Sequence, residues 1–266
     1  MSVNRRLLLA LFLILLFPLL LTHVALYFSG ATVLTERALN QLESVASIQR
    51  HRIEARIAQN LERLALVASR TQLRMSLASY RLDHDERYRA KMNRVLDDAL
   101  QAIDGFETIS VLDMSGRVAA STDRGLQDRD FSQKHCFQEG KKGNRVDMFY
   151  RDKRGRLSLH LAGPLKVRNA LVGVVVIRSS AWDIVAPVDD YSGLGNTGET
   201  VLAMRTEEGD ALFLAPARFD RDAALHRKVS KRNSNAPIMA ALAGREQQLS
   251  GAVDYRGQTV LSATRK

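Results

Sequence analysis

The chain contains only one cysteine, Cys136, among its 266 residues. A single thiol can form neither an intrachain disulfide nor a cysteine-based metal cluster, which excludes the small secreted folds held together by such links. Proline is also scarce, at five residues, and the stretch from Thr32 to Ser79 contains no proline and no glycine. That stretch therefore has no residue that would interrupt a long helix.

Acidic residues are outnumbered by basic ones, 29 against 39, which gives a net charge of +10. An excess of this size raises the question of nucleic-acid binding. The basic residues, however, are spread along the whole chain and alternate with acids, as in Asp128-Arg129-Asp130. No basic stripe with interleaved aromatic residues stands out. We therefore expect no nucleic-acid partner, but a solvated surface with some preference for anions.

The longest apolar run extends from Leu7 to Phe28 and carries no charge over 22 residues. As a helix it would be about 33 Å long, which is enough to cross a hydrocarbon core of about 30 Å. Pro18 lies inside the run, and membrane helices tolerate proline better than soluble ones do. The run predicts a single transmembrane helix at residues 7–28.

The charges on either side of this run predict its orientation. Arg5 and Arg6 precede it, whereas the twenty residues after it carry one basic residue against two acidic ones. Residues 1–6 should therefore stay cytoplasmic and the bulk of the chain should lie outside the cytoplasm. A cleaved signal peptide is the alternative, with Ser29 and Ala31 as a small-residue pair for a peptidase. The apolar core of such a signal is usually only about 7–15 residues long.

A long amphipathic helix, the stalk helix, is predicted for residues 32–80. Its apolar residues recur in steps of mostly three and four, which places them on one helix face. They are Leu39, Leu42, Ala46, Ile53, Ile57, Leu61, Leu64 and Ala68. A helix of about 70 Å needs something to cover this stripe. We expect that the rest of the chain packs along this stripe, that a second copy does, or that both do at different heights. The second copy would give a homodimer through the stalk helix.

The pattern then changes to short strands, which predicts an α+β domain of the PAS-like kind at residues 81–192. A helix from Glu86 to Ile103 comes first, and a loop-and-short-helix region at residues 123–144 separates two pairs of strands. The predicted strands are Thr108–Leu112, Arg117–Ser121, Leu157–Leu161 and Ala170–Ile177. We expect the last two to be joined around Gly163-Pro164. The last strand, which holds four valines, should be central and buried.

A second, smaller PAS-like module is predicted at residues 193–266. Its expected elements are two hairpins and one short helix that begins at a proline. They are Val201–Met204, Ala211–Leu214, Pro237–Ala243, Ser250–Tyr255 and Thr259–Ala263. The chain then stops apparently within a strand, so we expect this module to be truncated.

Three stretches, and a fourth at the end of the chain, resemble the double Cache (dCache) sensor family of bacterial chemoreceptors, sensor histidine kinases and diguanylate cyclases. VLDMSGRVAAST (Val111–Thr122) is similar to the first hairpin of the distal module in that family, and DFSQKHCFQEG (Asp130–Gly140) resembles its short ligand-side helix. GLGNTGETVLA (Gly193–Ala203) is similar to the entry into the proximal module, as VDYRGQTVLSATR (Val253–Arg265) is to its end. The resemblance implies a sensor anchored in the inner membrane, with a distal and a proximal module in the periplasm.

The resemblance also implies a small-molecule site in the distal module. Lys134 stands where the family often has an arginine that holds a ligand carboxylate, and Cys136 stands where it often has a tyrosine. Both departures put the common amino-acid pattern in question. Lys134 and Arg178, with Arg117, would favour an anion such as a dicarboxylate.

Tyr150 and Phe149 could close the wall of that site, and Asp130 begins the ligand-side motif, so Asp130 and Tyr150 complete the candidates. The alternative is that Lys134 and Arg178 are ordinary solvated side chains.

Two other chemistries are considered and set aside. Gly193–Thr200 contains Gly-x-Gly-x-x-Gly, but Glu199 stands where a phosphate loop needs lysine and a strand follows instead of a helix. His135 and Cys136, with His160 and Asp130 elsewhere, are residue types found in metal sites and as thiol nucleophiles. Adjacent residues on a helix, however, point about 100° apart. We predict no cofactor, no metal and no catalysis by the chain as given.

The remaining alternatives concern the whole protein. One is the front part of a sensor histidine kinase or diguanylate cyclase whose catalytic module is missing here. The other is a periplasmic scaffold that uses the stalk helix for oligomerisation and senses nothing.

Overall fold

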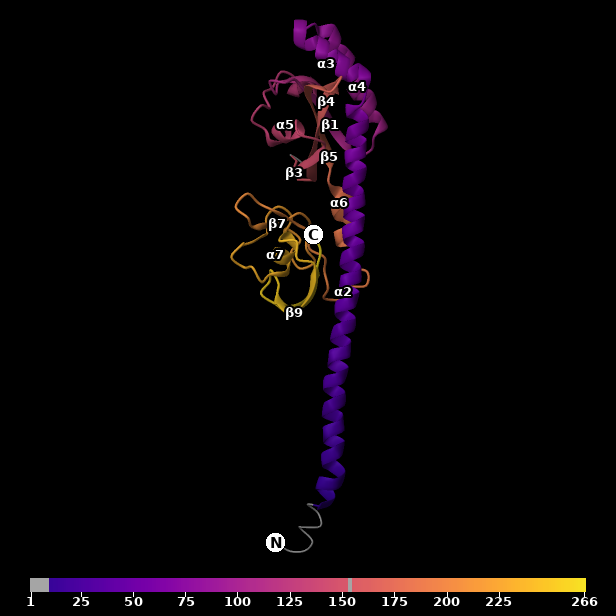
Figure 1. Ribbon diagram of the computed structural model, residues 1–266, viewed down its shortest axis with the longest axis vertical. Helices are drawn as coiled ribbons and strands as arrows, with labels where there is room; N and C mark the ends of the chain where they lie inside the picture. Colours follow the sequence, from indigo (N-terminus) through magenta and orange to yellow (C-terminus); the bar gives the residue numbers. More distant parts are fainter. Residues whose placement is uncertain (1–9, 153–154) are drawn as a thin grey trace.

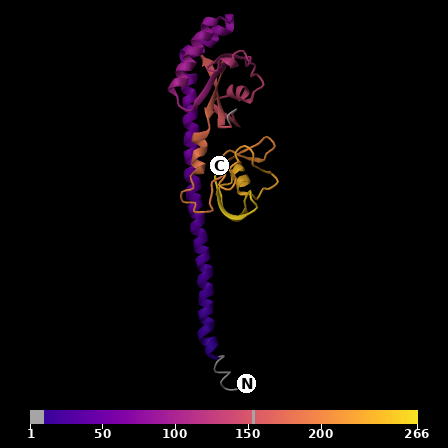
Figure 2. The same ribbon diagram turned by 180° about the vertical axis from the view of Figure 1, so that it is seen from behind.

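A computed structural model describes residues 10–152 and 155–266 of the chain. The predicted cytoplasmic segment, with Arg5 and Arg6, lies outside these residues, as does the predicted start of the membrane span at Leu7. One helix, α2 (Phe17–Ala68), runs along most of the molecule, and two modules are stacked on its outer half (Figure 1). The view from behind shows the same side-by-side arrangement (Figure 2).

The N-terminal part of this helix is apolar and packs against neither module. A short π-helical turn, η1 (Phe12–Leu16), precedes α2, and Pro18 follows it within the first turn of α2. Proline has no N–H to donate to the preceding turn, and a local widening of the helix accommodates that loss. The most apolar 18-residue stretch of the helix has a mean hydropathy of 2.1, and none of it is buried. The segment is thus long and apolar enough to cross a membrane.

The predicted helix over residues 32–80 is in fact two helices. α2 ends at Ala68, Arg70 has an extended backbone, and α3 (Thr71–Asp83) begins directly afterwards. The guanidinium of Arg74 donates to the carbonyl of Ser69 at 2.9 Å and to the carbonyl of Lys166 at 3.0 Å. The break thus lies beside a contact with a residue far along the chain, and no proline or glycine marks it.

The distal module is a five-stranded antiparallel sheet with the strand order β2-β1-β5-β4-β3. Its strands are β1 (Phe106–Leu112), β2 (Val118–Ser121), β3 (Arg145–Arg151), β4 (Leu157–Val167) and β5 (Ala170–Ser180). The valine-rich strand is central and buried, as predicted. β3 had not been predicted from the sequence.

The turn between β4 and β5 differs from the expected one. Gly163 and Pro164 lie within β4, and the turn is made by Arg168 and Asn169, whose φ angles are 48° and 66°. β3 pairs with β4 only as far as Ala162, so Pro164 lies where β4 has no neighbour on that side. Proline within a sheet is confined largely to positions with an unpaired side, and Pro164 lies at such a position.

The two faces of this sheet pack against different helices. One face is covered by α2, α3 and α4 (Glu86–Ala102), and it forms the larger core. The other face is covered by α5 (His135–Gly140), and we call it the α5 face. A short helical turn, η2 (Arg124–Leu126), leads toward α5. The larger core includes Leu64, Leu73, Leu77, Met92, Leu96, Ile109, Leu159, Leu161 and Ile177, none of which is exposed.

A short connector leads to the proximal module, made of α6 (Trp182–Val185) and η3 (Ala186–Asp189). The module has two separate sheets, β6-β7-β8 and β9-β10, and one helix, α7. Their bounds are β6 (Ala203–Arg205), β7 (Ala211–Phe213), β8 (Lys228–Val229), α7 (Pro237–Leu242), β9 (Gln247–Val253) and β10 (Thr259–Thr264).

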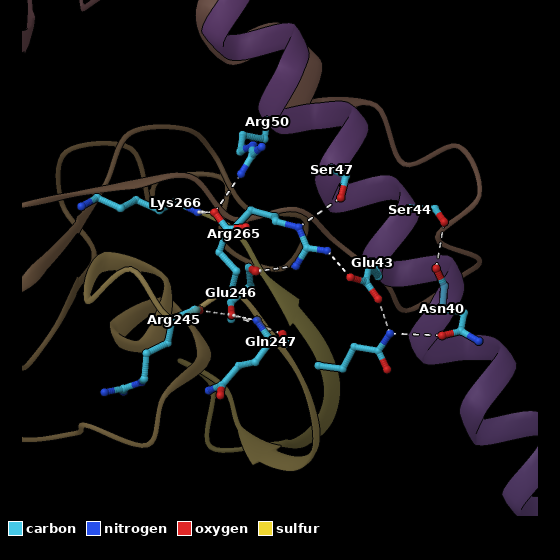
Figure 3. A network of polar contacts seen from close by, with 12 residues as sticks. Asn40, Glu43, Ser44, Ser47, Arg50, Arg245, Glu246, Gln247, Arg265 and Lys266 are labelled. Carbon is cyan, nitrogen blue, oxygen red and sulfur yellow. Dashed lines mark hydrogen bonds and ion pairs between the residues drawn. The ribbon is translucent and has the colours of Figure 1, made fainter.

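Polar contacts tie the β9–β10 hairpin to α2 (Figure 3). Arg265 donates to the hydroxyl of Ser47 at 3.0 Å and forms an ion pair with Glu43. The hydrogen bonds from Gln248 and Arg265 hold the pKa of the Glu43 carboxyl below its ordinary value. Arg50 forms an ion pair with Glu246 at 2.8 Å. We call these contacts the polar clasp.

Candidate functional site

A row of polar side chains crosses the α5 face. Val175 and Ile177 of β5 face the helices of the larger core, so alternation turns Arg178 toward the α5 face. Arg178 is in register with His160 of β4. The His160 ring stacks on the Tyr150 ring of β3, with the centroids 4.6 Å apart and the planes at 28°. The three strands β5, β4 and β3 thus each supply one member of the row.

The two rings of this row are neutral at pH 7. Burial lowers the pKa of His160 below its ordinary value and raises the pKa of Tyr150 to about 12. The phenolic oxygen of Tyr150 is buried and has no hydrogen-bond partner among the described residues. A buried polar atom without a partner costs about 1–3 kcal/mol. The hydroxyl is therefore available to a ligand or to water.

Arg178 has a partner already, which the sequence could not show. Its Nε donates to a carboxylate oxygen of Glu107 at 3.0 Å. Arg156 lies 3.3 Å from the other oxygen of the same carboxylate. The charge of Arg178 is therefore compensated at least in part, which weakens the argument that the row attracts an anion.

A buried carboxylate also lies on the α5 face. The side chain of Asp147 in β3 is only 2% exposed, and it pairs with the ring of His135 at the start of α5. Its charge acts to raise the pKa of both His160 and Cys136, which places it near both groups. Sequence reasoning missed Asp147 because it had not predicted β3.

Lys134 precedes α5 and stays exposed. Its positive charge acts to lower the pKa of both Cys136 and His160, so it lies over the same face. No hydrogen bond or ion pair joins its ammonium group to another described residue. Lys134 and Asp147 thus provide one unpaired cation and one buried anion at the same face of the sheet.

Cys136 and Phe137 form the apolar part of the site. Both are almost completely buried, and they pack against Ala162, Val174 and Val176 of the sheet. Burial, and then the charge of Asp147, raise the pKa of the Cys136 thiol to about 11. The thiol is therefore protonated at pH 7 and packs as a small apolar group.

Arg117 and Asp130 lie apart from this group. They form an isolated β-bridge with each other, and Arg117 donates to the carbonyl of Asp128 at 2.9 Å. Asp130 accepts a hydrogen bond from the backbone N–H of Ser132 at 2.7 Å, which lowers the pKa of its carboxyl. These contacts shape the loop that leads into α5. No described contact brings either side chain to the row.

In the glycine-rich turn between the modules, Glu199 stands where a phosphate loop would need lysine, and its carboxylate makes structural contacts. Glu199 accepts hydrogen bonds from the hydroxyl of Tyr255 at 3.0 Å and from the backbone N–H of Arg218 at 2.9 Å. The carboxylate thereby ties the turn to the β9–β10 hairpin. Within residues 10–152 and 155–266, no group of three or more histidine, cysteine or acidic side chains could hold a metal ion.

No protein-family model matches the chain, and no curated protein matches its sequence. Solved structures match its fold. The sensor domain of the V. cholerae histidine kinase DctB aligns with a TM-score of 0.51 and 19% identity. This alignment covers 65% of this chain and 65% of that one, slightly less than two thirds of its length.

A second similar structure is the ligand-binding domain of the amino-acid chemoreceptor PctC of Pseudomonas aeruginosa PAO1, in complex with GABA. It aligns with a TM-score of 0.51 and 16% identity, over 70% of this chain and 78% of that one. At such identities the likeness concerns the fold. The chain has the double Cache fold of bacterial extracytoplasmic sensor domains.

Proposed function

We propose that the chain is the ligand-sensing input domain of a membrane receptor and that its ligand binds on the α5 face of the distal module. The observation that carries this proposal is the buried hydroxyl of Tyr150, which has no partner. Lys134 and Asp147, one exposed cation and one buried carboxylate, lie at the same face. A small polar molecule at the α5 face would bond to the Tyr150 hydroxyl and the Lys134 ammonium, and it would share the Asp147 carboxylate with His135.

The charges favour a ligand that carries a carboxylate and a hydrogen-bond-donating or cationic group. Lys134 would bind the carboxylate as a point charge, and Asp147 would accept from the donor. The GABA complex of the PctC domain shows a ligand of that chemistry on the same fold. The fold likeness supports the proposal without fixing the ligand of this chain.

A dicarboxylate is the second candidate, and the pair of Lys134 and Arg178 favours it. For such an anion, Arg178 would have to exchange its contact with Glu107 for the ligand. Arg117, which the sequence also suggested, would have to leave the carbonyl of Asp128. A zwitterion requires neither change, but its cationic group would have to share Asp147 with His135.

The long helix suggests how binding would reach the membrane. α2 supplies Leu64 and Val67 to the distal core, and the same helix continues into the apolar segment that includes Pro18. A ligand that binds two packings of the distal module with different affinity would shift the equilibrium between them. We propose that a homodimer in the inner membrane transmits this shift, with both modules in the periplasm.

The chain as given would bind its ligand and catalyse nothing. The similar solved structures are sensor and ligand-binding domains. An output module of the histidine kinase or cyclase type would then belong to the same receptor. A scaffold that only oligomerises is the competing proposal, and it predicts no response to small molecules.

A thermal-shift screen tests the proposal. We expect one or more compounds from a panel of ω-amino acids, α-amino acids and dicarboxylates to stabilise the chain. A ligand at a hundred times its dissociation constant adds about 2.7 kcal/mol, or roughly 5–11 °C. Lys134→Glu should abolish this shift and leave the unliganded melting temperature unchanged, because the side chain is exposed.

Lys228→Glu is the matched control, since Lys228 is also exposed but lies on β8 of the proximal module. It should keep the full shift. An unresponsive wild-type chain, or a shift that survives Lys134→Glu, would contradict the proposed site. The class of compound that responds decides between a zwitterion and a dicarboxylate.

A further inference from the structure

An irregularity in β3 lies at the position of Asp147. The pairing of β3 with β4 shifts its register between Val146 and Phe149, and both of these residues pack against the larger core. Asp147 lies inside this shift, and a bulge of this kind can turn a side chain to a new direction and is common beside functional sites. The Asp147 side chain is only 2% exposed, so its carboxylate is shielded from water.

This carboxylate forms one ion pair with a described residue, and the partner is His135. The contact joins Nδ1 of the ring to one of the two carboxylate oxygens. The His135 side chain is 59% exposed, so its ring can exchange a proton with water while it stays beside Asp147. A buried carboxylate needs a hydrogen-bonding or cationic partner. In the free chain an exposed, titratable ring supplies it.

Two other charged side chains of α5 and its N-terminal end have different roles. Glu139 lies near His135, but it already forms ion pairs with Lys142 and Arg145 of β3. These ion pairs contribute to holding the pKa of the Glu139 carboxyl below its ordinary value. Lys134 adds a positive charge beside His135, where the carboxylate of the proposed ligand would bind.

The titratable and charged groups beneath α5 also differ from His135. Burial keeps Cys136 and Tyr150 protonated, since it raises the pKa of the thiol to about 11 and that of the phenol to about 12. Burial lowers the pKa of His160, so this ring takes up a proton only at a lower pH than an ordinary histidine. Arg178 pairs with Glu107 at 3.0 Å.

The proposed ligand would place a cationic group at the same carboxylate, and the inference drawn from this rests on the site proposed above. Histidine side chains commonly change charge between about pH 5 and pH 8. When the His135 ring carries a proton, it neutralises Asp147 and repels a second cation beside it. When the ring is neutral, it can keep at most a hydrogen bond, and the negative charge of Asp147 is left for the ligand.

We propose that His135 is a competitor built into the site: its protonated ring holds the charge of Asp147 against the cationic group of the ligand, and loss of its proton admits that group. The receptor would therefore bind zwitterions more weakly as the pH falls. Binding would also release the proton, because the two cations exclude each other. One competing proton can weaken the affinity by at most about tenfold per pH unit.

The test uses the full chain in detergent and three zwitterionic probes, GABA, β-alanine and δ-aminovalerate. Their carboxylate and ammonium groups keep their charges from about pH 6 to about pH 8. Titration calorimetry in two buffers of different ionisation enthalpy gives both the affinity and the number of protons released. His135→Asn keeps an uncharged amide beside Asp147. His226→Asn is the matched control, since His226 is also exposed but lies between β7 and β8 of the proximal module.

We expect the affinity of the wild-type chain for at least one probe to fall by about threefold or more from pH 8 to pH 6, with release of a proton on binding. His135→Asn should bind that probe equally at both pH values and release no proton. His226→Asn should behave like the wild type.

The outcomes separate this inference from the proposed site. An affinity that is constant or rises as the pH falls would overturn the competition and leave the site standing. So would a pH dependence that survives in His135→Asn or disappears in His226→Asn. Failure of all three probes to bind at pH 8 would overturn the zwitterion site and this inference together.

Discussion

Tyr150 is the residue on which the proposed site depends most. In the free chain its hydroxyl is buried without a partner, so it contributes nothing to stability and carries a cost. In the complex we expect it to bond to the ligand. The same atom should therefore have opposite effects on folding and on binding.

Tyr150→Phe tests this expectation. Removing the unpaired hydroxyl should leave the free energy of unfolding unchanged or raise it by up to about 1 kcal/mol. The affinity for the ligand found by the screen should fall by about fivefold or more, since one hydrogen bond contributes about 1 kcal/mol. Urea unfolding and calorimetric titration give the two values. A variant that unfolds more readily but binds normally would show that the hydroxyl has a structural partner.

His160 makes the stability of the distal module depend on pH. Burial lowers its folded pKa below the ordinary value of 6.5, so the unfolded chain takes up the proton first as the pH falls. This residue therefore costs nothing well above pH 6.5 and destabilises the fold progressively below it. His160→Phe keeps a ring against Tyr150 and should lose less stability between pH 7.5 and pH 5. Urea unfolding at several pH values tests this prediction. Parallel curves of unfolding free energy against pH for the wild type and the variant would contradict it.

The sequence pointed to several residues of the proposed site for identifiable reasons. The ligand-side motif pointed to Lys134 and Cys136, the end of the valine-rich strand pointed to Arg178, and Tyr150 was proposed as part of the wall of the site. Asp147 was missed because no strand was predicted between the loop-and-short-helix region, which ends at residue 144, and the strand that begins at Leu157. The Glu107 partner of Arg178 could not be predicted either, because it comes from a neighbouring strand 71 residues away.

Among the secondary-structure elements, α5 determines how close a ligand can come to the sheet. It approaches the sheet closely at Gly140, where a Cβ atom would come within 2.6 Å of Val174 and 2.9 Å of Ala162. A side chain at this position would have to push the helix away from the strands. The glycine thus fixes the spacing of the whole α5 face.

Gly140→Ala should destabilise the chain by about 1–3 kcal/mol, the usual cost of overpacking, and should weaken ligand binding. Gly143→Ala is the matched control, because nothing lies within 4 Å of its added Cβ atom. Gly143→Ala should change the free energy of unfolding by no more than about 0.5 kcal/mol and should leave the affinity for the ligand normal. Chemical unfolding and calorimetric titration of both variants measure these effects. Equal unfolding free energies and affinities for the two variants would refute the role given to Gly140.

The fold class was predicted better than the limits of its elements. Apolar periodicity identified α2, and the valine run identified the central strand β5. The break after Ala68 was missed because no proline or glycine marks it, and the contact beside it, from Arg74 to the carbonyl of Lys166, is a tertiary one. The turn at Arg168 and Asn169 was missed because Gly163-Pro164 carries a stronger local turn signal.

At the scale of the whole molecule, α2 is the element that both modules share. It packs into the distal core, lines a cavity of the proximal module and joins the polar clasp through Glu43 before entering the apolar segment. A change in the packing of the distal module therefore has one continuous helix through which to act. The clasp would couple the β9–β10 hairpin to the same movement.

Amide hydrogen exchange of the full chain, with and without a stabilising ligand, tests the proposed site most directly. Ligand binding at the α5 face should slow exchange in α5, β3 and β4 and leave β6 and β10 unchanged. Lys134→Glu should remove that protection. Protection confined to β6, β10 and the facing part of α2, with α5 unaffected, would contradict the claim that the distal module binds the ligand.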